Sequence, residues 1–182
     1  NTRLEWIFFD LAIMAAGGAT TTVYPSTNAD DVAFILSDSG SRIVIAEDGK
    51  QLGKLNDQRG SIPAVEKVVL IDTTGVDLAS RGDDWVIASD DLAGRGRALL
   101  DSDADAVTRA TDAVRPESLA TLIYTSGTTG RPKGVELTQS NWTYEAASIE
   151  GLGLLRPDQL QFLWLPLSHS FGKVLLAAQM QI

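Results

Sequence analysis

Cysteine is absent from the 182-residue sequence, and histidine occurs only once. Without cysteine the chain can form neither disulfides nor thiolate metal sites, which fits a cytoplasmic location. Basic residues are few, because 15 lysines and arginines stand against 24 acidic residues, a formal charge of −9. Nucleic acid recruits basic surfaces, so this balance argues against nucleic acid as a partner. A small anion is not excluded, because a few local donors can bind one in an acidic protein.

Long apolar runs are also missing. The most apolar stretch, residues 6–19, contains Asp10 and falls short of the roughly 20 residues that a membrane span needs. Its Ala/Gly ending has a slight likeness to a signal-peptide cleavage region, but the acidic residues in and beside it favour a helix of a globular domain. The chain begins at Asn1 and stops inside an apolar run, without a residue that typically ends a helix, so we expect a fragment of a longer protein.

Strand and helix patterns alternate through the first seventy residues. An apolar stripe at helical spacing marks the first helix: Leu4, Ile7, Phe8, Leu11, Met14 and Ala15. Gly17 and Gly18 are expected to end this helix. The next expected elements are a strand over residues 20–24, a helix from Asn28 to Gly40, a strand over 42–46, a helix over 50–58 and a strand over 67–71. This alternation predicts an α/β fold with a parallel sheet.

The pattern weakens between residues 73 and 114, where acidic residues are frequent. Leu92 and the pair Leu99 and Leu100 indicate one short helix. We interpret the whole segment 73–114 as an acidic surface excursion between two parts of the sheet. The run from Asp101 through Asp103 to Asp105 resembles the start of a calcium loop. Such a loop needs glycine at its sixth position, where this sequence has alanine, so a solvated acidic segment is favoured.

Regular patterns return after residue 118. The expected elements are a strand over residues 119–125, a strand over 135–137, a helix over 139–151, a strand over 162–165 and a helix from Phe171. Three tryptophans, Trp6, Trp142 and Trp164, fall on apolar faces and are expected to lie in the core.

Residues 124–134 form the most informative stretch, Tyr-Thr-Ser-Gly-Thr-Thr-Gly-Arg-Pro-Lys-Gly. Directly after an apolar strand, this stretch combines four Ser/Thr hydroxyls, three glycines and two cations. Glycine lets the backbone turn with positive φ and present N–H groups to an anion. Hydroxyls can donate to phosphate oxygens or bind a magnesium ion, and Lys133 adds a compact positive charge. The composition therefore predicts a loop that binds polyphosphate.

The loop differs from the P-loop of common nucleotide hydrolases. That motif has its lysine followed by Ser or Thr at the start of a helix, whereas here Pro132 precedes Lys133 and Gly134 follows it. We therefore expect the order strand, loop, strand. An ordinary polar hairpin turn would explain each Gly, Thr or Ser separately, but it would not explain their combination with a lysine.

The stretch 124–134 resembles the phosphate-loop signature of the AMP-forming acyl-adenylate superfamily. This superfamily includes acyl-CoA synthetases, firefly-type luciferases and the adenylation domains of peptide synthetases. The likeness continues through residues 135–138 and returns at 165–172, Leu-Pro-Leu-Ser-His-Ser-Phe-Gly. Residues 1–6 and 24–25 are similar to the early part of long-chain fatty acyl-CoA synthetases. The resemblance implies that residues 1–182 are part of a large N-terminal, AMP-binding domain with sheets layered between helices, without the small C-terminal domain.

The resemblance implies a two-step reaction. ATP and a carboxylic acid, expected to be a medium or long fatty acid, give an acyl-adenylate and pyrophosphate, and coenzyme A then takes the acyl group. By the same match, the β- and γ-phosphates are held by a set of loop residues: Thr125, Ser126, Gly127, Thr128, Thr129, Gly130 and Lys133. Thr125 would also lie beside the magnesium ion, Mg²⁺.

His169 matches a family histidine that lies beside the nucleotide and the acyl pocket. On its own, a single histidine at this place would more often be structural, and the match gives it a positioning role rather than proton transfer. Gln139 stands where many relatives have a histidine, which should alter the helix start more than the chemistry. The family's adenine- and ribose-binding segments, acidic magnesium ligand, hinge and adenylation lysine would follow Ile182, so we expect no catalytic residue here and no complete reaction.

Two other functions stay open at this stage. The chain could be a nucleotide-binding module without catalysis, or part of an enzyme that adenylates an aryl or amino acid. Within the ligase reading the partners are the small molecules ATP, fatty acid and coenzyme A. The sequence leaves peripheral membrane association and the oligomeric state open.

Overall fold

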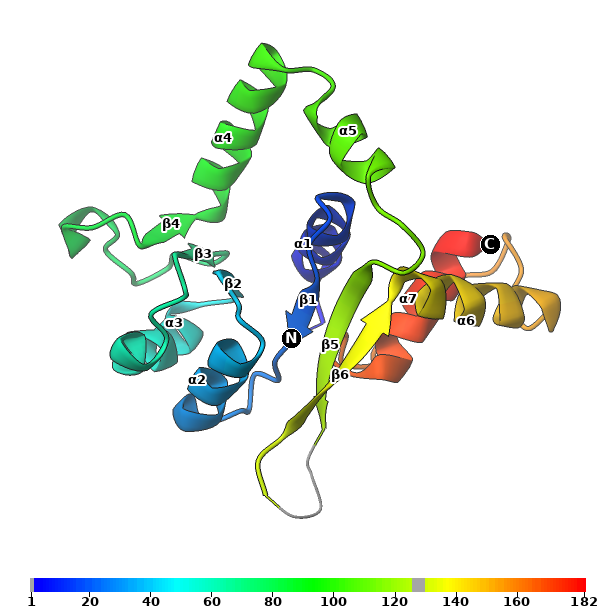
Figure 1. Ribbon diagram of the computed structural model, residues 1–182, viewed down its shortest axis with the longest axis horizontal. Helices are drawn as coiled ribbons and strands as arrows, with labels where there is room; N and C mark the ends of the chain where they lie inside the picture. Colours follow the sequence, from blue (N-terminus) through cyan, green and yellow to red (C-terminus); the bar gives the residue numbers. More distant parts are fainter. Residues whose placement is uncertain (1, 126–129) are drawn as a thin grey trace. The chain divides into compact units, whose positions relative to one another are not determined.

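Two three-stranded sheets organise the chain, one in each of two units (Figure 1). The computed structural model describes residues 2–125 and 130–182. One unit comprises residues 1–22 and 110–182, and the other comprises residues 23–109. We call them the hairpin unit and the parallel-sheet unit. The architecture is mixed α/β, as predicted.

The parallel-sheet unit contains strands in the order β2-β3-β4. Its elements are α2 (Ala29–Asp38), β2 (Ile43–Ala46), α3 (Gly49–Asp57), η1 (Arg59–Ser61), β3 (Lys67–Leu70), η2 (Ala79–Arg81), β4 (Val86–Ala88) and α4 (Ser89–Ser102). The central strand β3 is buried, and Val68 and Leu70 have no exposed surface. Asn28 begins α2 as predicted, because its side chain accepts a hydrogen bond from the Asp31 N–H at 2.8 Å.

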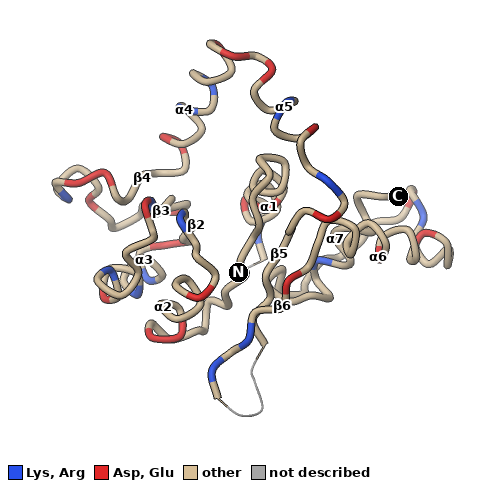
Figure 2. Tube along the Cα trace, in the orientation of Figure 1, with Lys and Arg blue, Asp and Glu red and all other residues tan. Residues whose placement is uncertain are grey.

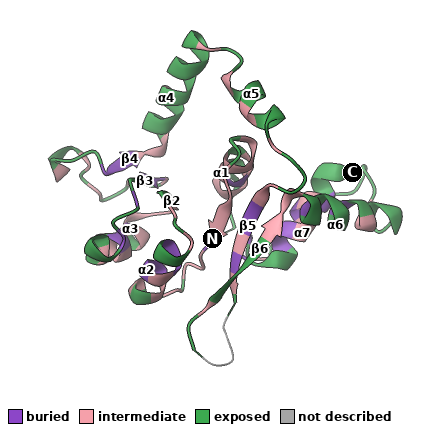
Figure 3. Ribbon diagram, viewed as in Figure 1, coloured by how far each residue is buried: buried purple, intermediate pink, exposed green. Residues whose placement is uncertain are grey.

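The hairpin unit carries the predicted loop. Its elements are α1 (Leu4–Ala15), β1 (Thr20–Thr22), β5 (Leu119–Thr125), β6 (Lys133–Thr138), α6 (Gln139–Gly151) and α7 (Ser170–Gln181), and α5 (Ala106–Asp112) spans the boundary between the units. β5 is central, parallel to β1 and antiparallel to β6. Figure 3 shows buried residues along β5 and mostly exposed ones along β6. α1 ends before Gly17, which adopts φ +78°, as predicted.

The alternation of strand and helix does not build one sheet. β1 joins β5 in the hairpin unit, whereas β2 and β3 pair with each other in the other unit. β4, which was not predicted, lies within the segment 73–114 and pairs with β3. Trp85 anchors its start, since the buried indole Nε1 donates to the Val65 carbonyl at 2.9 Å. The helix expected around Leu92 is α4, which is 14 residues long.

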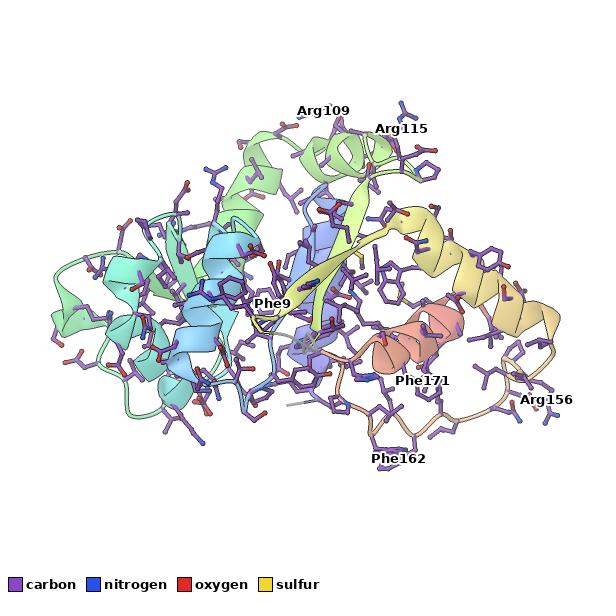
Figure 4. All side chains as sticks on the ribbon, turned by 60° about the horizontal axis from the view of Figure 1, so that its bottom comes forward. Phe9, Arg109, Arg115, Arg156, Phe162 and Phe171 are labelled. Atoms are coloured by element: carbon purple, nitrogen blue, oxygen red, sulfur yellow. The ribbon has the colours of Figure 1, made fainter. Side chains whose placement is uncertain are left out.

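The strand predicted over residues 162–165 is wrong. These residues are described and form no strand, because no neighbouring strand pairs with them. Phe162 is 85% exposed and Trp164 is 69% exposed, so the expectation that Trp164 lies in the core is also wrong. Figure 4 shows Phe162 pointing outward from this segment. A short apolar run such as this one indicates a strand only where a partner strand is present to pair with its backbone.

The apolar stripe of α1 predicts the helix correctly but not its buried face. Leu4 and Phe8 are each 60% exposed, whereas Asp10 is only 1% exposed. Within the described ranges, no helix is both long and apolar enough to span a bilayer. A buried carboxylate such as that of Asp10 requires a partner of opposite charge. This partner is Lys173, which lies near the C-terminal end of the chain in the same unit.

Candidate functional site

The β5–β6 hairpin places two of the predicted site residues opposite each other. Thr125 ends β5, Lys133 begins β6, and the two residues form the last pair of the antiparallel ladder. The predicted order of strand, loop and strand is confirmed. Both residues are exposed. Ser126, Gly127, Thr128 and Thr129, also predicted to bind phosphate, lie outside the described residues.

Glycines shape the described part of this hairpin. Gly130 has φ +145°, a conformation that side-chain-bearing residues rarely adopt. Gly134 pairs with Tyr124 across the ladder, and a Cβ at position 134 would lie 3.0 Å from the Tyr124 ring. The aromatic ring therefore covers the backbone of β6 directly. A larger residue at position 134 would push this ring away and disturb the base of the hairpin.

Positive charge collects where β6 begins. Arg131 and Lys133 lie two residues apart in the chain, and Figure 2 shows basic residues on the described part of the β5–β6 hairpin. Within the described part of the chain, no carboxylate forms an ion pair with the Lys133 ammonium, and Lys133 is exposed as the ladder partner of Thr125. An exposed cation opposite a hydroxyl is suited to an anionic oxygen ligand such as phosphate.

His169 caps helix α7. Its Nδ1 accepts a hydrogen bond from the Phe171 N–H at 3.2 Å, and the ring is exposed. Because Nδ1 serves as the acceptor, the N–H of the ring is on Nε2. The cap satisfies one of the free N–H groups at the start of the helix. The cap therefore orients a single N–H donor, Nε2–H, at the N-terminus of α7.

The first turn of α7 lies directly on the preceding backbone. A Cβ added at Gly172 would be 2.5 Å from the Pro166 carbonyl oxygen, a distance that real Cβ atoms do not reach. Only glycine permits this approach, and the His169 N–H closes the same turn by donating to the Pro166 carbonyl at 3.0 Å. The position of His169 is therefore set by backbone packing as well as by its cap.

Sequence reasoning missed a buried polar cluster, which is formed by side chains of α1, β5, α6 and α7. The Lys173 ammonium donates to Asp10 Oδ1 and to Thr121 Oγ1, each at 2.8 Å, and Trp142 Nε1 donates to the same Thr121 oxygen at 3.1 Å. The Lys173 and Asp10 side chains are 3% and 1% exposed. Burial lowers the pKa of Lys173, and the Asp10 carboxylate partly opposes this shift.

Sequence signals for this cluster existed but pointed at no partner. Asp10 is the acidic residue inside the most apolar stretch, and Lys173 precedes an apolar helical run. The two residues are 163 positions apart, so no local pattern links them. A cavity of about 410 Å³ adjoins the cluster, lined largely by apolar side chains of α1, α6 and α7 such as Met14, Ala146 and Leu176.

The structure brings some predicted residues together and leaves others apart. Thr125 and Lys133 are ladder partners, and Gly130 lies between them in the chain. His169 belongs to the same unit, but among the described residues no hydrogen bond joins it to Thr125 or Lys133.

In the parallel-sheet unit, the Asp103 carboxylate accepts hydrogen bonds from the Arg109 guanidinium, which lowers the pKa of Asp103.

Comparison with known proteins relates nearly the whole chain to one family. The family model described as AMP-binding enzyme matches residues 1–181. A long-chain-fatty-acid–CoA ligase of Mycobacterium bovis, FadD15, is 35% identical over 179 residues, which is 97% of this chain and 28% of the relative. The long-chain-fatty-acid–CoA ligase ACSBG1 of Rattus norvegicus is 29% identical over 93% of this chain and 23% of its own length. The chain therefore spans less than a third of these relatives.

Solved structures share the fold. A Rhodopseudomonas palustris protein assigned as a long-chain-fatty-acid CoA ligase has a TM-score of 0.74, with 22% identity over 99% of this chain and 40% of that one. ATP-bound MatB from the same organism has a TM-score of 0.66, with 17% identity over 99% of this chain and 31% of its own. At these identities the likeness supports the architecture, including the β5–β6 hairpin unit.

The cap made by His169 gives a testable stability difference. His169→Ala removes the acceptor at the start of α7 and should lower the free energy of unfolding by about 0.5–1 kcal/mol, whereas His169→Asn replaces Nδ1 with a capping oxygen and should retain most of the stability. Urea unfolding followed by circular dichroism measures both. An unchanged free energy of unfolding in His169→Ala, or an equal loss in both variants, would show that the capping acceptor is not the source of the stabilisation.

Proposed function

Because the chain belongs to the AMP-binding enzyme family, we propose that it holds the triphosphate of ATP in a ligase that activates a fatty acid and transfers it to coenzyme A. The observation that supports this most directly is the hairpin end, where Lys133 and Thr125 face each other with no competing carboxylate pair among the described residues. We place the reaction in the cytoplasm, where its small-molecule substrates are found.

The residues at the hairpin end fit a polyphosphate. The Lys133 ammonium would neutralise charge on the β- and γ-phosphates, and hydrogen bonds to charged groups contribute about 1.5–3 kcal/mol each. The hydroxyls of Thr125, Ser126, Thr128 and Thr129 and the backbone N–H groups near Gly127 and Gly130 would donate to the remaining oxygens. These donors stabilise the leaving pyrophosphate as its negative charge grows.

Magnesium fits this site as a shared ion rather than as one held by the chain alone. Thr125 offers one hydroxyl oxygen, and Mg²⁺ typically takes its other ligands from phosphates and water. When bound, the ion supplies charge neutralisation on the phosphates. The chain itself contributes Thr125, whose backbone position at the end of β5 is set by its ladder pair with Lys133.

His169 fits a positioning role. Its Nδ1 is used as the acceptor of the helix cap, which leaves Nε2–H as the donor of the ring. We propose that this donor orients the nucleotide or the acid at the N-terminus of α7, whose dipole also favours a negative group. Proton transfer is not needed for this role.

The acid class rests on the relatives. Both relatives named above are long-chain-fatty-acid–CoA ligases, which favours a medium or long fatty acid as the substrate of this protein. Because the chain covers 28% of the first relative, we expect it to bind nucleotide but not to complete the reaction alone. An aryl or amino acid substrate, or nucleotide binding without catalysis, is the alternative.

Exchange of pyrophosphate into ATP tests the proposal. The protein at its full encoded length should exchange labelled pyrophosphate only when a fatty acid is present, and a panel of fatty, aryl and amino acids identifies the class. Exchange with amino acids alone would overturn the fatty acid assignment. Nucleotide binding without exchange for any acid would instead favour the non-catalytic module.

Removing the hairpin charge should weaken nucleotide binding. Lys133→Ala loses one charge-assisted hydrogen bond, so affinity for a nonhydrolysable ATP analogue should fall about 10- to 100-fold. Isothermal titration calorimetry measures this change. Lys50→Ala, which removes an exposed lysine at the start of α3, is the matched control and should bind normally. Unchanged affinity in Lys133→Ala would contradict the assigned role.

The hydroxyl of Thr125 should matter for magnesium more than for folding. Thr125→Val keeps the branched shape but removes the oxygen, so the magnesium concentration that half-saturates pyrophosphate exchange should rise. We expect a shift of about 10-fold, the effect of one lost hydrogen bond or ligand. Thr108→Val changes an exposed threonine of α5 in the same way and serves as the control. An unaltered magnesium dependence would remove Thr125 from the site.

A further inference from the structure

We propose that the buried Lys173–Asp10 pair is a positioning device that couples the N-terminus of α7 to the end of β5. Through this pair, His169 and Thr125 would be held in one fixed arrangement for adenylate formation. The inference rests on the proposed function for its catalytic consequence. Its structural part, the coupling of helix to strand, can be measured separately.

Lys173 uses its ammonium to connect three elements of the hairpin unit. From α7 it donates to Asp10 of α1 and to Thr121 of β5. The Trp142 and Trp6 rings lie near the same ammonium, with their centroids 5.1 and 5.7 Å from Nζ. These contacts fix the charge in direction as well as in distance, because both hydrogen bonds and the aromatic faces must be satisfied together.

Thr121 links the cluster to the phosphate end of β5. Side chains alternate along a strand, so Thr121, Ile123 and Thr125 point to the same face, and Thr125 lies about 13 Å further along. The two donors on Thr121 Oγ1, from Lys173 and Trp142, occupy both of its acceptor positions. The strand is therefore held at Thr121 from α7 and α6 at once.

One turn at the start of α7 connects Lys173 to His169. Lys173 follows His169 by four residues, and its N–H donates to the His169 carbonyl at 3.3 Å. Gly172, between them, packs against the Pro166 carbonyl. Any rotation or sliding of this turn would break the Lys173 bonds or drive Gly172 into that backbone. The cluster thus determines where the His169 ring stands relative to β5.

Stability alone is a poor reason for this pair. Two charges lose their hydration when buried, and replacing such a pair with apolar side chains is often neutral or stabilising. One oxygen of the pair, Asp10 Oδ2, has no hydrogen-bond partner among the described residues, which adds to the cost. What apolar side chains cannot supply is the fixed direction of hydrogen bonds to Thr121, and that is the property a positioning role requires.

The decisive variant removes both charges at once. Asp10→Leu with Lys173→Met leaves no unpaired charge, and the adjoining cavity can accept the added volume. We expect stability to urea close to that of the wild type, together with a fall of about a hundredfold in the kcat of pyrophosphate exchange, the size expected from misplacing reacting groups by about 1 Å. The KM for ATP should change much less, because Lys133 and the loop remain.

Two single variants test the positioning role with smaller changes to the buried cluster than the double variant makes. Lys173→Arg retains the charge and should recover part of the exchange rate, and Thr121→Val removes only the acceptor on β5 and should lower kcat. Lys54→Met is the matched control, since the Lys54 ammonium also makes two hydrogen bonds, to the Pro25 and Thr27 carbonyls, but in the other unit. That control should keep the wild-type exchange rate.

Amide hydrogen exchange separates this inference from the proposed function. In the double variant, amides at the end of β5 and in the first turn of α7 should both exchange faster than in the wild type, while those of β3 should not. A folded double variant with wild-type kcat and unchanged protection at both places would overturn the coupling. A wild-type protein with no pyrophosphate exchange would defeat the proposed function, and the protection pattern would then decide the coupling alone.

Discussion

β5 can present Thr125 at the end of its sheet only because hydrogen bonds hold both of its long edges. β1 pairs with one edge in parallel, and β6 pairs with the other in antiparallel orientation. The strand is therefore an internal one, buried at Ala120 and Thr121 and exposed only at its end. Every feature of the candidate site depends on this strand, because the loop leaves from it and both α6 and α7 contact it.

The site combines two kinds of electrostatic environment. At the hairpin end, Lys133 is exposed, so its charge remains available to an anion but is screened by solvent and salt. Beneath the helices, Lys173 is buried, so its charge is held by Asp10 and is not available to a ligand. The exposed lysine is suited to binding and the buried one to orientation, and neither could replace the other.

Local signals predicted the parts of the fold that local interactions build. Asn28 beside Asp31 and the glycines after α1 predict helix ends, because a cap involves residues only a few positions apart. The hairpin was predictable because its glycines, hydroxyls and lysine follow one another in the chain. The Lys173–Asp10 pair was not, since its members are 163 residues apart and each occurs in an apolar segment.

The errors have equally physical causes. β4 is three residues long and follows Asp83 and Asp84, so its pattern is too short to be recognised, and it forms because β3 offers an edge. Residues 162–165 show the converse: all four are apolar, but a strand also needs a neighbouring strand to pair with. Which sheet a strand joins depends on the whole chain, and this is why β1 was not separated from β2 and β3.

The exposed segment after α6 also bears on how the protein behaves in solution. Leu160, Phe162 and Trp164 stand out at alternate positions of an unpaired stretch that has no charge and no proline between residues 159 and 165. Such sequences readily form intermolecular β-structure, which natural proteins normally suppress by covering or charging them. Concentrated preparations of this chain would therefore be prone to self-association through this segment, and a charged residue introduced there would favour solubility.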